Sequence, residues 1–215
     1  ENFESFSVPS TLQNGWVNAT GDDMDWSVNA GPTGSGNTGP DVDFTFGTSA
    51  GKYLYLEATS NFPDKTALLT TPFVDVSNHN NVLLEFYYHM YGVTMGKLII
   101  EASGNGTDWS TIGYISGEKH LDQLAPWFRK RIVLPANADS VQIRFRGVTG
   151  SSFTSDLSID NITMYGYSEV LTGLYTYGGS SNEEGESIVQ TPEGDFILAG
   201  YTSSYGGGNR DIYLV

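Results

Sequence analysis

Hydrophobic and polar positions alternate with a period of two along much of this chain. Residues 141–147 read Val-Gln-Ile-Arg-Phe-Arg-Gly, so that every second side chain is apolar, and residues 82–89 repeat the pattern. A period of two sends successive side chains to opposite faces, which predicts half-buried antiparallel strands. The same reasoning predicts further strands at 52–58, 97–102, 131–134 and 159–165.

Polar turn sequences separate these predicted strands. Examples are Gly104-Asn-Gly106 after one strand and Gly150-Ser-Ser152 after another, and such clusters mark turns. The only segment that suits a helical turn, 120–124, is too short to change the fold class. Regular short strands with polar turns predict an all-β fold, a jelly-roll β-sandwich of two antiparallel sheets.

The composition shifts near Ser168, after which the chain is rich in glycine. Three short strands are predicted there, at 187–190, 196–201 and 211–215, with a turn at 191–195. Three short strands cannot bury a hydrophobic face by themselves. We therefore predict one domain over residues 1–168 and the beginning of a longer, incomplete structure over residues 169–215.

The charge balance excludes some classes of partner. The 215 residues contain 25 acidic and 10 basic residues, for a net charge of −15. Nucleic acid requires clustered lysine and arginine, and an acidic chain is repelled by anionic membranes. No apolar stretch is long enough for membrane insertion. The high content of Gly, Ser, Thr, Asn and Tyr with little Lys favours a secreted or cell-surface protein. Residues 1–4 lack signal-peptide features, so we expect the signal peptide to be already absent.

An ordered set of sequence blocks resembles the MAM domain family, named for meprin, the A5 antigen and a receptor tyrosine phosphatase. The most telling blocks are Asp22-Asp-Met-Asp-Trp26, Leu84-Glu-Phe-Tyr-Tyr-His-Met-Tyr-Gly92 and Ser155-Asp-Leu-Ser-Ile-Asp-Asn-Ile162. The resemblance covers residues 1–166 and implies a jelly roll used in adhesion and recognition, without catalysis. Animal members carry conserved cysteines and this chain has none, which favours a bacterial relative within a larger secreted protein.

The tail resembles one unit of a bacterial repeat that builds β-propellers. The matching blocks are Tyr177-Gly-Gly179, Glu184-Gly-Glu-Ser-Ile-Val-Gln190 and Gly194-Asp-Phe-Ile-Leu-Ala-Gly-Tyr201. A propeller closes only with about 4–8 blades, so this unit is at most a fragment of one blade.

Three carboxylates are the candidate ligands of a structural Ca²⁺ ion. The first and last strands of a jelly roll commonly lie side by side, which places Glu4 near Asp160, and Asp43 lies on a loop that can close over them. MAM domains hold a cation at matching positions, and Ca²⁺ takes oxygen ligands from such loops. Asp25 and Asp41 are additional candidates. The alternative is that these are solvated carboxylates in an acidic chain.

No residue pattern indicates an enzyme. His89 invites a catalytic interpretation, but its position predicts a histidine at the surface or at a strand edge. His79 and His120 lie in polar loops without the spacing of a zinc site, and no nucleophile elbow, P-loop or dinucleotide motif occurs.

Two groups of side chains are candidates for ligand binding. Tyr87, Tyr91, Trp109 and Tyr114 are candidates for a sugar-stacking surface, whereas Trp16, Trp26 and Trp127 are expected in the core. Arg129, Lys130 and Arg131, with Arg144 and Arg146, are candidates for a basic patch that binds an acidic polysaccharide or protein. The alternative for this patch is a charged sheet face that prevents edge pairing.

The sequence thus predicts a non-catalytic adhesion or recognition module, stabilised by Ca²⁺, whose partner is a protein on the cell surface or in a secreted complex. The second candidate function is a carbohydrate-binding module, with a polysaccharide as the ligand, attached to a polysaccharide-active or glycan-attaching protein. The third is a passive spacer. Exposed coplanar aromatic residues favour the sugar, and an apolar patch with a polar rim favours a protein.

Overall fold

The computed structural model describes residues 1–8, 12–79, 81–134, 139–166, 179–190, 196–205 and 211–214. The chain divides into two compact units, Glu1–Tyr167 and Ser168–Val215. All regular elements in the described residues are strands, which confirms the predicted all-β class. Nowhere in these ranges does the chain form a helix suited to crossing a bilayer.

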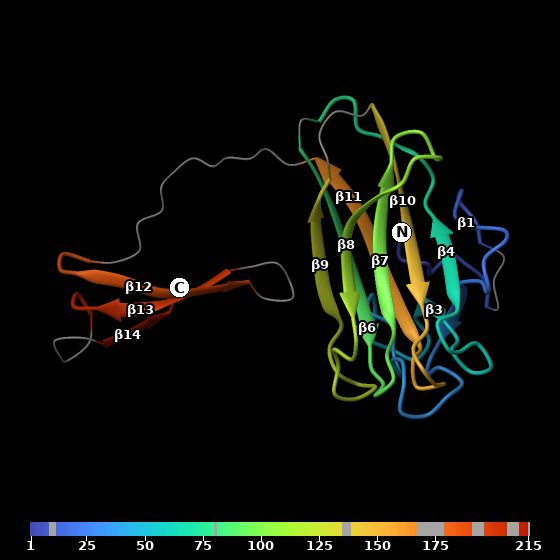
Figure 1. The fold of residues 1–215 in the computed structure, drawn as a ribbon, viewed down its shortest axis with the longest axis horizontal. Helices are drawn as coiled ribbons and strands as arrows, with labels where there is room; N and C mark the ends of the chain where they lie inside the picture. Colours follow the sequence, from blue (N-terminus) through green and yellow to red (C-terminus); the bar gives the residue numbers. More distant parts are fainter. Residues whose placement is uncertain are drawn as a thin grey trace. The chain divides into compact units, whose positions relative to one another are not determined.

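Two antiparallel sheets make up the first unit (Figure 1). The first sheet has the order β1 (Val17–Asn18), β4 (Thr66–Thr70), β10 (Ser140–Val148), β7 (Lys97–Ser103), β8 (Ser110–Ser116), with β5 (Val74–Asp75) paired to β10. The second sheet has the order β2 (Ser27–Ala30), β3 (Lys52–Leu56), β11 (Leu157–Gly166), β6 (Val82–Met90), β9 (Phe128–Val133). Strands distant in sequence are therefore neighbours, as in a jelly roll.

The core lies between the two sheets and is built from the alternating apolar positions. Phe145 of β10 is paired with Ile100 of β7, and both side chains are fully buried. Phe86 of β6 meets Phe145 edge to face across the core, with ring centroids 5.2 Å apart. A Cβ at Gly147 would overlap the Leu56 side chain, so a larger residue at this strand position would displace Leu56.

Two long loops cover part of the outer face of the second sheet. They comprise residues 31–51, between β2 and β3, and residues 117–127, between β8 and β9. The loops bind each other, since the Asp41 N–H donates to the Gln123 carbonyl oxygen at 2.9 Å and Trp127 Nε1–H donates to the Val42 carbonyl oxygen at 3.0 Å. Part of this sheet face is therefore interior, which strand alternation alone does not indicate.

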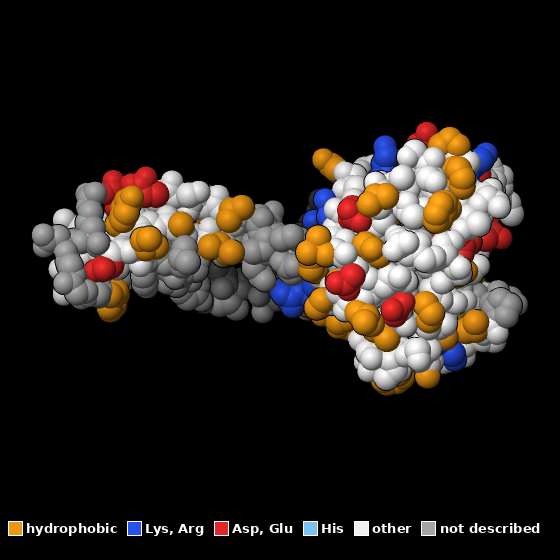
Figure 2. All heavy atoms as spheres, turned by 90° about the horizontal axis from the view of Figure 1, so that it is seen from below, with side chains coloured by type: hydrophobic (Ala, Val, Ile, Leu, Met, Phe, Trp, Pro, Cys, Tyr) orange, Lys and Arg blue, Asp and Glu red, His pale blue; other side chains and the backbone are white. Residues whose placement is uncertain are grey.

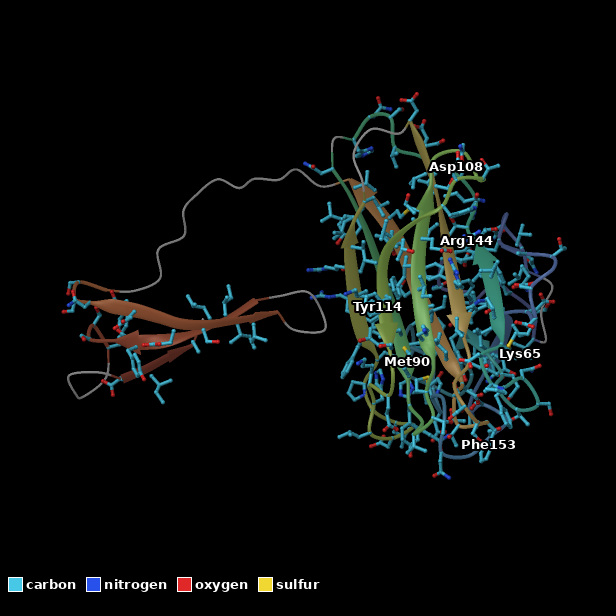
Figure 3. All side chains as sticks on the ribbon, viewed as in Figure 1. Lys65, Met90, Asp108, Tyr114, Arg144 and Phe153 are labelled. Carbon is cyan, nitrogen blue, oxygen red and sulfur yellow. The ribbon has the colours of Figure 1, made fainter. Side chains whose placement is uncertain are left out.

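Four loops gather at one end of the sandwich, and we call them the loop end: residues 57–65, 91–96, 117–127 and 149–156. Figure 3 places Phe153 at this end. Hydrogen bonds join the loops, from Thr94 Oγ1 to the Thr154 carbonyl oxygen at 3.0 Å and from the Gly117 N–H to the Gly96 carbonyl oxygen at 2.8 Å. The loop end is thus a cross-linked structure rather than a set of independent turns.

The second unit is an antiparallel sheet of β12 (Glu183–Gln190), β13 (Phe196–Thr202) and β14 (Asp211–Leu214). Ile188, Val189 and Ile212 are exposed on it. The predicted turn at 191–195 lies outside the described residues. The resemblance of this unit to a propeller repeat stays a prediction.

Candidate functional site

Asp43 and Asp160 are neighbouring buried carboxylates on the outer face of the second sheet. Asp160 lies on β11, and its Oδ2 accepts hydrogen bonds from the N–H groups of Phe44 and Thr45 at 3.1 and 3.2 Å. Asp43 Oδ2 accepts from the Phe46 N–H at 2.7 Å. The loop that follows β2 therefore wraps around both carboxylates, as the sequence predicted for Asp43.

These two carboxylates fit a cation of the calcium type. Burial, with a smaller contribution from the charge of Asp43, raises the pKa of the Asp160 carboxyl to about 7. Neither carboxylate forms an ion pair with a lysine or arginine of the described residues. Buried charges need a compensating charge, and carboxylate oxygens are ligands that Ca²⁺ prefers.

The structure does not gather the other predicted ligands, Glu4, Asp41 and Asp25, into one metal-binding group with Asp43 and Asp160. Glu4 lies in a turn and not on a first strand, which corrects the expectation, and its Oε1 accepts from the Lys52 N–H at 2.9 Å. Asp41 accepts from the Gln123 amide at 2.9 Å, and Asp25 is exposed. No three His, Asp or Glu side chains among the described residues are arranged to hold a metal ion.

The expectation that His89 lies at the surface is wrong. Its side chain on β6 is fully buried, because residues 117–127 place His120 and Trp127 over it. The two imidazole rings stack with centroids 4.1 Å apart. Burial lowers the pKa of His89 to about 3 and that of His120 to about 4. A histidine that stays neutral and inaccessible serves the fold rather than catalysis.

The four candidate aromatic residues do not form one sugar-stacking surface. Tyr87 on β6 is covered by Phe44, whose ring stacks on it at 3.4 Å between centroids. Tyr114 is exposed on β8 of the other sheet, and Trp109 lies under the Arg144 guanidinium, 4.2 Å from the ring centroid. Tyr91 is half-buried, and its carbonyl oxygen accepts from the Gly39 N–H.

The predicted five-residue basic patch does not form either. Arg144 and Arg146 lie on β10 of the first sheet, whereas residues 129–131 lie on β9 of the second sheet. Both arginines bind Glu101 of β7, with Arg144 Nε 2.6 Å from Glu101 Oε2. Glu101 is almost fully buried. The sequence places Glu101 on the strand predicted at 97–102 but does not indicate this pairing.

The three basic residues of β9 point to two different sides of the second sheet. Arg129 is paired with Tyr87, Lys130 with the core residue Phe86, and Arg131 with Glu85. Arg131 Nε donates to Glu85 Oε2 at 2.6 Å, so its charge is balanced locally. The strand alternation therefore separates Lys130 from its two neighbours. Binding of a ligand by these residues stays a prediction.

Several apolar side chains are strongly exposed at the loop end. Leu121 is 89% exposed, Val93 81% and Leu124 68%, and Phe62 and Phe153 are also exposed. Figure 2 views the molecule from this end and shows apolar side chains spread over it between largely uncharged surface. The acidic residues of these loops that reach the surface outnumber the basic ones: Glu57, Asp64, Glu118 and Asp122 against Lys65 and Lys119.

Comparison with known proteins agrees with this architecture. The family profile described as MAM domain, meprin/A5/mu, matches residues 2–168. MAM domain-containing glycosylphosphatidylinositol anchor protein 1 of Rattus norvegicus is 30% identical over 159 residues, 70% of this chain and 16% of the relative. MAM domain-containing protein 2 of Homo sapiens is 32% identical over 143 residues, 64% of this chain and 19% of the relative. This chain therefore spans less than a fifth of either relative.

A solved structure shares the fold at low sequence identity. The K1 cleaved adhesin domain of Lys-gingipain from Porphyromonas gingivalis W83 superimposes with a TM-score of 0.54 and 16% identity. The superposition covers 78% of this chain and 97% of that domain. The likeness supports the jelly-roll arrangement of the strands.

Proposed function

This chain belongs to the MAM domain family, and on that premise we propose that it is an extracellular binding module that recognises a protein through its loop end. The observation that carries the proposal is the exposure of Leu121, Val93 and Leu124 on loops that hydrogen bonds join to one another. A loop backbone held in place loses little conformational freedom on binding, and a large exposed apolar patch marks an interaction site.

The charge of the loop end indicates which kind of protein surface can bind it. The loops carry an excess of acidic side chains around the apolar ones, and the whole chain has a net charge of −15. Complementary potentials favour association and like charges oppose it. The partner that fits is therefore a protein with an apolar patch bordered by lysine or arginine.

The module would hold a structural Ca²⁺ ion at Asp43 and Asp160, and the contribution of Glu4 as a third ligand stays a prediction. Both carboxylates are buried, and neither has a lysine or arginine of the described residues as a counter-charge, which supports this role. The ion would supply the positive charge that the described protein groups lack there. It would join the loop before β3 to β11, so its effect would be on stability rather than on catalysis.

Extracellular placement is supported by the relatives, one of which is named for a glycosylphosphatidylinositol anchor. We propose a secreted or surface-displayed module that binds and does not catalyse. The carbohydrate alternative is less well supported, because Phe44 covers Tyr87 and the other candidate aromatic residues lie apart.

The experiment uses beads coated with the full chain and cells of the organism that makes it. Cells are treated with protease, with a mixture of glycosidases, or with buffer before the beads are added. Loss of bead binding after protease alone is the expected result. Loss after glycosidases alone, with binding retained after protease, would establish the carbohydrate alternative, and no binding to untreated cells would favour the passive spacer.

A further inference from the structure

Asp156, directly before β11, carries a buried oxygen atom without a partner. Its side chain is fully buried, and Oδ1 accepts from the Ala58 N–H at 2.8 Å. Its own N–H donates to Thr38 Oγ1 at 2.8 Å. Oδ2 has no hydrogen-bond partner among the described residues. A buried carboxylate oxygen left in this way is unfavourable unless a proton or a cation satisfies it.

A second carboxylate faces the same place. Glu57, next to Ala58, lies within hydrogen-bonding reach of the Asp156 carboxyl, and its charge acts on that group; its Oε1 accepts from the Thr59 N–H at 2.9 Å. Glu57 is only half-buried, so this place is open to solvent on one side. No lysine or arginine of the described residues forms an ion pair with either carboxylate.

Neutral oxygen atoms complete the surroundings. The Thr33 hydroxyl lies beside Asp156 and donates to the Thr38 carbonyl oxygen at 3.1 Å. Thr33 and Thr38 are both buried. Two carboxylates and neutral oxygen atoms, without nitrogen or sulfur, are the donor set of a hard divalent cation.

We propose that Asp156 and Glu57 bind a divalent cation of the calcium type, at a site separate from Asp43 and Asp160. The cation lies between Asp156 Oδ2 and the half-buried Glu57 carboxylate, and two negative charges match its charge. It joins the loop after β3 to the start of β11, and through Thr38 to the loop that precedes β3. These segments support the loop end, so the cation stiffens the base of that surface.

Calcium alone is the probe, titrated calorimetrically into the full chain, with Tb³⁺ as a luminescent substitute. Tyr53 and Tyr55 lie near Asp156, so excited tyrosine sensitises Tb³⁺ bound there. The variants are Glu57→Gln and Asp156→Asn, with Asp160→Asn to remove the other candidate site. Because Glu57 is only half-buried, the Glu57→Gln variant should fold. It therefore tests the site even if the Asp156→Asn variant does not fold.

The proposal predicts a calcium-binding event that Glu57→Gln weakens at least tenfold and Asp160→Asn retains. Equal stoichiometry and affinity in wild type and Glu57→Gln would overturn it. Loss of an event in Asp160→Asn alone would support the Asp43–Asp160 ion and refute this one. Loss in Glu57→Gln alone would support this site and refute the other, so the two failures are distinguishable.

Discussion

His89 and His120 stack face to face inside the protein, with ring centroids 4.1 Å apart and planes inclined by 24°. His120 Nδ1 accepts a hydrogen bond from the Met90 N–H at 3.1 Å. The backbone of Asp122 and Ala125 lies near the His89 ring and that of Pro126 near the His120 ring, but both nitrogen atoms of His89 and Nε2 of His120 lack a hydrogen bond of good geometry among the described residues. The pair is therefore a neutral, desolvated contact between β6 and the loop of residues 117–127.

This pair predicts that acid destabilises the loop end. Both folded pKa values, about 3 and about 4, lie below the ordinary 6.5, so the unfolded chain takes up protons first as the pH falls. The stabilisation is complete above pH 6.5 and is lost as the pH falls toward 4 and 3. At pH 4.5 each histidine lowers the free energy of unfolding by about 2 kcal/mol.

The measurement is urea unfolding of wild type and His89→Phe between pH 7 and pH 4.5. The raised pKa values of Asp156 and Asp160 act in the opposite sense, and they cancel in the difference between the two proteins. The variant should lose less stability than wild type over this range. Parallel profiles of the free energy of unfolding against pH would contradict the role assigned to His89.

Glu101 provides a second prediction, on charge pairing within the first sheet. Its side chain is 3% exposed and balances Arg144 and Arg146, so Glu101→Gln leaves two arginines without a counter-charge. We expect a loss of about 2 kcal/mol in the free energy of unfolding. Glu85→Gln is the matched control, since the pair of Glu85 with Arg131 is more exposed and its loss costs about 0.5 kcal/mol. Equal losses would contradict the distinction.

Chelation tests the proposed ion at Asp43 and Asp160. A ligand at about a hundred times its Kd contributes roughly 2.7 kcal/mol, and each kcal/mol shifts Tm by about 2–4 °C in a domain of this size. Excess EDTA should therefore lower Tm by roughly 5–10 °C. In the Asp160→Asn variant, the part of the Tm shift that this ion causes should vanish. An unchanged wild-type melt in EDTA would exclude a structural ion.

Gly51 offers a test of the packing around Asp43. A Cβ at this position would overlap the Asp43 carboxylate, so Gly51→Ala should displace that side chain and lower stability by about 1–3 kcal/mol. Gly36→Ala is the control, because nothing lies within 4 Å of its Cβ and its effect should stay within about 0.5 kcal/mol. The measurement compares the denaturant midpoints of Gly51→Ala and Gly36→Ala, and equal midpoints would contradict the predicted displacement of Asp43.

The strands were predictable because alternation is a local signal. Residues 141–147 and 82–89 place their apolar side chains inward in the structure as the period of two requires. The predicted start of the 131–134 strand was wrong by three residues, since β9 begins at Phe128. Its early positions carry Arg129 and Lys130, which at a sheet edge are only half-buried and give little hydrophobic pattern.

The candidate sites were only partly predictable, because loops remote in sequence decide them. The alternation places His89 on the outer face of β6, and this is correct, but residues 117–127 then bury it. Nothing near Glu101 in sequence reveals its pairing with Arg144, 43 positions away. The family resemblance predicted Asp43 and Asp160 as metal ligands. The unpartnered oxygen of Asp156, in contrast, can be identified only in the folded structure.

The central claim is that the loop end is the recognition surface, and the double variant Leu121→Ser/Leu124→Ser tests it most directly. Val133→Ser is the control, because Val133 is 58% exposed on β9 and outside the loop end. Binding of protein-coated beads to cells is measured alongside the Tm of each protein. The account predicts at least a tenfold loss of binding in the double variant, with Tm and the control unchanged. Full binding by the double variant, or an equal loss in Val133→Ser, would contradict it.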